Sequence, residues 1–94
     1  PQDSAANAYK GVSDIPHGGY KIYDEHDARA LSVVIRFTTD EERASGCRVS
    51  GTSVEVTTTT GAVMTVPLVN TVKPETATCS TAESLVIVRI TKAS

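Results

Sequence analysis

Large aromatic side chains are scarce in this 94-residue chain. It contains no tryptophan, one phenylalanine (Phe37), three tyrosines and one methionine (Met64). A folded core must therefore be built mainly from valine, isoleucine, leucine and alanine. No apolar run approaches the about 20 residues that a membrane-spanning helix requires, so the sequence predicts no membrane span.

Basic residues are too few and too scattered to form a nucleic-acid surface. Nine Lys and Arg stand against eleven Asp and Glu, which gives a formal net charge of −2. Proteins that bind nucleic acids usually concentrate Lys and Arg on one surface, so the charge argues against such a partner. Two catalytic motifs are missing as well, because the sequence has no Gly-x-Ser-x-Gly elbow and no glycine-rich phosphate loop.

Two cysteines, Cys47 and Cys79, bracket much of the strand-like part of the sequence. We expect them to form a disulfide, which favours a secreted, extracellular or periplasmic location. Two free thiols in a cytosolic protein are the alternative. The bridge would close a loop of roughly 32 residues and contribute about 3.7 kcal/mol through lost chain entropy. Residues 1–94 are accordingly predicted to form a single disulfide-stabilised domain, in which residues 1–18 are a flexible arm or a short helix.

Alternating apolar residues predict several strands. The clearest is Leu31–Thr38, where every second side chain from Leu31 to Phe37 lies on one face. The last strand, Ser84–Thr91, is apolar on both faces, which is typical of a central position in a sheet. A shorter strand is expected at Gly19–Tyr23, after a Pro-His-Gly-Gly turn.

The threonine-rich centre of the chain predicts a β-hairpin, and burial selects its register. A three-residue loop at Thr59–Gly61 pairs Val56 with Met64 and Val54 with Val66, so that four apolar side chains share one face. A two-residue loop would instead place the two valines opposite a threonine and a proline. We therefore predict the three-residue loop, with its glycine in the left-handed conformation.

A short helix is predicted at Asp3–Gly11, and a single helical turn or short helix at Asp40–Ser45, because Thr39 and Glu42 have the spacing of a capping box. Residues 70–82 are interpreted as a loop. Pro67 marks the second strand of the hairpin as an edge strand.

The pattern indicates a mainly β protein. We expect a small antiparallel β-sandwich or a partly open barrel, built from five strands with one or two short helices. A sixth strand is added if Arg48–Ser50 pairs. The alternative is an α+β two-layer sandwich with the helices on one face of a sheet.

Weak candidates for catalysis are clustered in one charged stretch. It contains His17 and His26 together with Glu25 and Arg29, which could act as acid, base and phosphate-stabilising groups in a small secreted nuclease or other hydrolase. Only two good nitrogen donors are present, so neither a metal site nor a cofactor is predicted.

Exposed loops on a rigid scaffold favour binding over catalysis. The predicted contact residues are Tyr20 and Tyr23, together with the loop residues Thr59, Thr60 and Gly61. The first hypothesis is a secreted, non-enzymatic recognition protein of the effector, toxin-subunit or inhibitor type, whose partner is a protein or another cell-surface target. Besides this hypothesis and the hydrolase, a third alternative is that the chain is an extracellular structural or adhesive module of a larger protein.

Overall fold

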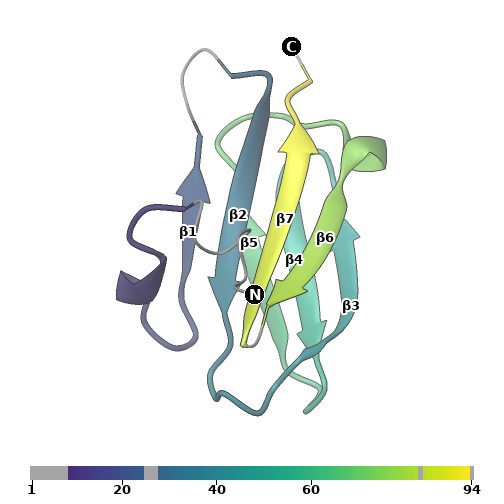
Figure 1. Cartoon of the computed structure of the whole chain (residues 1–94). Coiled ribbons are helices and arrows are strands. Elements are labelled where there is room, and N and C mark those ends of the chain that lie inside the picture. The colour runs from purple at the N-terminus through teal and green to yellow at the C-terminus, as the bar shows by residue number, and fades with distance from the viewer. Residues whose placement is uncertain (1–8, 25–27, 83, 94) are drawn as a thin grey trace.

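Two antiparallel sheets face each other in the computed structural model, which describes residues 9–24, 28–82 and 84–93 (Figure 1). One sheet has the strand order β1-β2-β7-β6 and the other β3-β4-β5. The predicted mainly β sandwich is thus confirmed, with two short 3-10 turns in place of longer helices. In the described part of the chain, the elements are η1 (Val12–Asp14), β1 (Tyr20–Tyr23), β2 (Ala30–Arg36), β3 (Ala44–Val49), β4 (Ser53–Thr58), β5 (Val63–Pro67), η2 (Pro74–Thr76), β6 (Thr78–Ala82) and β7 (Leu85–Thr91).

The core lies between the sheets and is almost entirely aliphatic. Strand β2 contributes alternate side chains from Leu31 onward, as its sequence predicts, and Phe37 follows directly after it. The buried residues of this cluster are Leu31, Val33, Ile35, Phe37, Val54, Val56, Val66, Val72, Val86, Val88 and Ile90.

Strand β7 occupies the central position that its apolar faces predict, between β2 and β6. Its inner face contributes Val86, Val88 and Ile90 to the main core. On its outer face, Ile87 is buried in a second, smaller cluster with Ile15.

The β4–β5 hairpin has the predicted register. Val56 pairs with Met64 and Val54 with Val66, and the loop residues are Thr59, Thr60 and Gly61. The Gly61 φ angle of +90° lies in the left-handed region, as a three-residue loop requires. Strand β5 is an edge strand, as Pro67 indicates.

In place of the single helical turn or short helix predicted at Asp40–Ser45, the structure has one hydrogen-bonded turn over residues 39–42 and then a strand. The predicted capping interaction does form, since the Thr39 N–H donates to Glu42 Oε1 at 3.1 Å and the Glu42 N–H donates to the Thr39 carbonyl at 3.4 Å. The chain then leaves the turn at Arg43, whose carbonyl accepts a hydrogen bond from the Thr59 N–H. Pairing with the neighbouring hairpin therefore replaces helix extension, and β3 begins at the next residue.

Two strands differ from the prediction. Strand β3 begins earlier than the predicted Arg48–Ser50 and ends at Val49, and Gly46 lies at an irregularity in its pairing instead of ending a helix. Thr78–Ala82, predicted as part of a loop, is the edge strand β6, which brings the described strands to seven. Its sequence of two threonines, a serine, a cysteine and an alanine has no apolar alternation. The helix predicted at Asp3–Gly11 falls mostly outside the described residues.

The predicted disulfide joins the two sheets. Cys47 lies on β3 and Cys79 on β6, which are edge strands of different sheets on the same side of the sandwich (Figure 1). Both cysteines are paired with core valines, Val56 and Val88, so their side chains project into the space between the layers. The bond therefore closes one open side of the sandwich.

Candidate functional site

The N-terminal segment covers part of the outer face of the four-stranded sheet. Ile15 packs there with Val34 and Ile87, and Tyr9 lies against this cluster. Arg36 holds the segment in place, because its Nη1 donates to the Ile15 carbonyl at 2.9 Å. A hollow lies beside this segment on the same face of the sheet.

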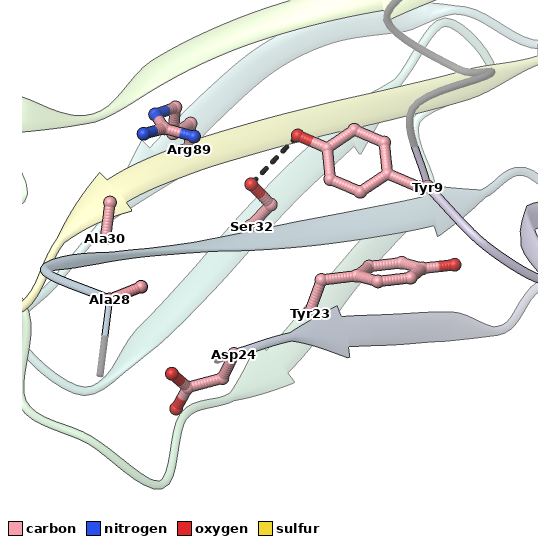
Figure 2. A pocket seen from close by; sticks show the side chains of 7 residues that line it. All are labelled: Tyr9, Tyr23, Asp24, Ala28, Ala30, Ser32 and Arg89. Carbon is pink, nitrogen blue, oxygen red and sulfur yellow. Dashed lines mark hydrogen bonds between the residues drawn. The ribbon is translucent and has the colours of Figure 1, made fainter. Parts of the chain in front are cut away.

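Three side chains cross this hollow in a single row. Tyr23 on β1 pairs with Ser32 on β2, and Ser32 pairs with Arg89 on β7. Directly opposed residues project from the same face, and adjacent strands are about 4.8 Å apart. Tyr23 and Arg89 therefore stand on strands about 10 Å apart, with the small Ser32 side chain between them (Figure 2).

Two tyrosine rings form one wall, and hydrogen bonds fix both. The Tyr9 hydroxyl donates to Ser32 Oγ at 2.9 Å, and the Tyr23 hydroxyl donates to the Lys10 carbonyl at 2.5 Å. The ring centroids are 4.9 Å apart with an interplanar angle of 56°. Burial raises the pKa of Tyr23, and the Asp14 carboxylate and Tyr9 raise it further. Tyr23 therefore remains a neutral donor, and its ring stays in place.

Among the described residues that line the hollow, one cation has no counter-charge and one acid is compensated. Arg89 is exposed and makes no hydrogen bond or ion pair with any residue that the structure describes. Asp24 is held by Lys92 through an ion pair and by Asn70 through a hydrogen bond. The uncompensated charge facing the hollow is thus positive.

The hollow has a volume of about 380 Å³ and is lined also by two small side chains, Ala28 and Ala30. This volume is near the lower end of the roughly 300–1,000 Å³ that small-molecule sites occupy. It offers aromatic faces, a guanidinium group and a hydroxyl. These lining groups can hold a small anion by hydrogen bonds and charge. Among the described lining residues there is no nucleophile hydrogen-bonded to a base.

The predicted contact residues divide between two places. Tyr23 lines the hollow. Tyr20 is exposed but opposes the core residue Ile35, so it projects from the other face of β1. Thr59, Thr60 and Gly61 lie in the β4–β5 loop of the other sheet, where Thr60 donates to Glu42 at 2.6 Å.

The structure does not bring the described catalytic candidates together. His17 precedes β1 and lies 3.3 Å from an Asp40 carboxylate oxygen. Arg29 precedes β2, at the far end of that strand from the residues that contact the His17 loop. A strand of seven residues is about 20 Å long, which is too far for a shared reaction centre. Glu25 and His26 lie outside the described residues, so the hydrolase hypothesis stays a prediction.

Several lining residues were not predicted from the sequence, among them Tyr9, Asp24 and Arg89. The alternation of Leu31–Thr38 implies that Ser32 lies on the outward face of its strand, and Ala30, two residues earlier, shares that face. Two small residues on this face indicate a shallow place in it, but the residues that surround them depend on strand pairing and are not specified by the local sequence.

Fold and site together define a disulfide-linked β-sandwich with a small, tyrosine-walled hollow on one outer face, where the guanidinium group of Arg89 is exposed. No family model, curated protein or solved structure matches the chain. Within the described ranges, no helix is long and apolar enough to cross a membrane, and no group of three or more His, Cys, Asp or Glu side chains could hold a metal ion.

Proposed function

We infer that this protein is an extracellular, non-enzymatic recognition domain that binds a macromolecule through the hollow on its four-stranded sheet. The observation that carries this proposal is Arg89, an exposed guanidinium group without a partner among the described residues, beside two immobilised tyrosine rings. The disulfide supports the extracellular location, because such bonds persist mainly in oxidising compartments. The effector, toxin-subunit and inhibitor roles all require such a binding surface.

The hollow is organised before any partner arrives. Four of its lining residues, Tyr23, Ala30, Ser32 and Arg89, come from three strands of one sheet, and both tyrosine hydroxyls already have acceptors. The two tyrosine rings therefore lose little side-chain entropy on binding, which favours affinity at a small surface. Tyrosine and arginine are also the residue types that dominate binding energy at protein surfaces.

Binding to an array of immobilised extracellular proteins and cell-surface glycans tests the proposal. Arg89→Glu reverses the charge at the hollow, and because this side chain is exposed the variant is expected to fold normally. Arg48→Glu makes the same change on the exposed side of β3 and is the matched control. We expect saturable binding to at least one target, lost in Arg89→Glu and retained in Arg48→Glu.

Three results would overturn the proposal. The first is the absence of saturable binding to any target, and the second is equal binding by Arg89→Glu and wild type. The third is loss of binding only when Thr59 and Thr60 are both changed to alanine, which would assign recognition to the β4–β5 loop.

A further inference from the structure

We propose that the group recognised by the hollow is an acidic sugar, a six-membered ring that carries a carboxylate, at the end of a glycan. The proposal rests on the recognition function inferred above and specifies its ligand. It is carried by three features of the hollow: its charge, one unused hydroxyl proton, and the shape of its walls.

The charge selects an anion. Asp24 is compensated by Lys92 and Asn70, whereas Arg89 has no acceptor among the described residues. A guanidinium group presents parallel N–H donors that match a carboxylate in a bidentate arrangement. A neutral ligand could accept hydrogen bonds from this group but would leave its charge uncompensated.

An unused donor selects a ligand that also has hydroxyl or ring oxygens. Ser32 is only 4% exposed and accepts the hydrogen bond from Tyr9. A serine hydroxyl can accept and donate at once, and no described residue accepts the proton of Ser32. Buried polar groups normally have their hydrogen-bonding capacity satisfied. A ligand oxygen placed over Ser32, between the Arg89 guanidinium and the tyrosine wall, would accept that proton.

The walls select a ring in preference to a peptide strand. The hollow lies on a sheet face, where the backbone N–H and C=O groups are used within the sheet, so strand addition to an extended peptide is not available there. Recognition must use side chains alone. The Tyr23 and Tyr9 rings offer apolar faces to the C–H face of a sugar ring. A hollow of about 380 Å³ accommodates a terminal sugar but not a helix or a folded domain.

The direct test is an NMR titration of the ¹⁵N-labelled protein with glucuronic acid and N-acetylneuraminic acid. We expect saturable shifts of the amides of Tyr23, Ser32 and Arg89 with at least one acidic sugar, and none with glucose or acetate at equal concentration. Arg89→Gln should weaken binding roughly tenfold or more, since hydrogen bonds to charged groups contribute that much. Arg48→Gln, an exposed arginine on β3 outside the hollow, should bind within about twofold of wild type.

The sugar assignment is overturned if neither acid binds, if glucose or acetate produces the same shifts, or if Arg89→Gln binds as well as wild type. The array experiment separates this failure from that of the proposed function. Arg89-dependent binding to a protein target, without binding of either sugar, would leave the recognition function standing and remove only the sugar. Loss of all Arg89-dependent binding would remove both.

Discussion

At the scale of single residues, Glu42 shows how a buried carboxylate can stabilise a loop. It is 4% exposed, and its oxygens accept hydrogen bonds from the Thr60 hydroxyl at 2.6 Å and from the Thr39 N–H at 3.1 Å. Hydrogen bonds to the carboxylate lower the Glu42 pKa from 4.5 to about 2. The bond from Thr60 has the largest effect, and a bond from Thr38 follows. The ionised form is therefore the one that ties the β2–β3 connection to the β4–β5 loop.

This depressed pKa predicts a pH dependence of stability. A carboxyl whose pKa is lower in the folded state contributes stability that is complete above the unfolded value and lost as pH falls through the folded value. The midpoint of thermal unfolding should thus decrease between about pH 4.5 and pH 2, and Glu42→Gln should reduce both the midpoint at pH 7 and this decrease. Glu75→Gln, an exposed acid in η2, is the control. Identical pH profiles for Glu42→Gln and wild type would contradict the assignment.

Residue patterns along the chain could predict burial but not the hollow. The alternation from Leu31 to Phe37 identifies the core face because a strand has a period of two. The row of Tyr23, Ser32 and Arg89 depends instead on the relative register of three strands, two of them far apart in sequence. No local pattern specifies that register, so the neighbours of Tyr23 could be recognised only after folding.

At the scale of elements, local signals succeeded where loop chemistry and burial agreed. The β4–β5 hairpin has a glycine at the loop position that requires a left-handed backbone, and the same register buries its valines. At residues 39–42 the capping signal was real, but it acted over one turn only. Strand β6 gave no signal, since its inward-facing residues Cys79 and Thr81 are not an apolar series and only the pairing with β7 shows which face is inward.

Gly61→Ala tests the hairpin assignment. No atom lies within 4 Å of the position that a Cβ would occupy at Gly61, so any cost comes from its φ of +90° and not from a clash. A left-handed conformation costs an L-residue about 1–2 kcal/mol, and we expect the free energy of unfolding in urea to fall by that amount. Gly51→Ala is the matched control, because its nearest neighbour would be at 3.9 Å and its φ lies outside that region. Equal effects of the two substitutions would show that the loop conformation is not what constrains Gly61.

At the scale of the whole molecule, the disulfide is the covalent link between two sheets whose other connections are loops. Cys47 and Cys79 are 32 residues apart in the sequence, a separation for which chain-entropy arguments give about 3.7 kcal/mol of stabilisation. Small domains have total stabilities of about 5–15 kcal/mol, so this one bond accounts for a large fraction. The Cys47→Ala/Cys79→Ala double variant should lose about 3–4 kcal/mol in urea unfolding, with a correspondingly lower thermal midpoint.

The same variant separates stability from recognition. The hollow is built on β1, β2 and β7, whereas the disulfide joins β3 to β6, so the bond contacts none of the lining side chains. At a temperature where the double variant remains folded, it should therefore bind the array target with an affinity within about twofold of the wild-type value. This difference is smaller than the effect of a typical hydrogen bond.

Mass spectrometry after alkylation, with and without a reductant, establishes the redox state of the wild-type protein used for comparison. Loss of binding by a folded double variant would show that the spacing of the two sheets controls the hollow, because the outer row of Tyr23, Ser32 and Arg89 would then depend on how the core beneath it is packed.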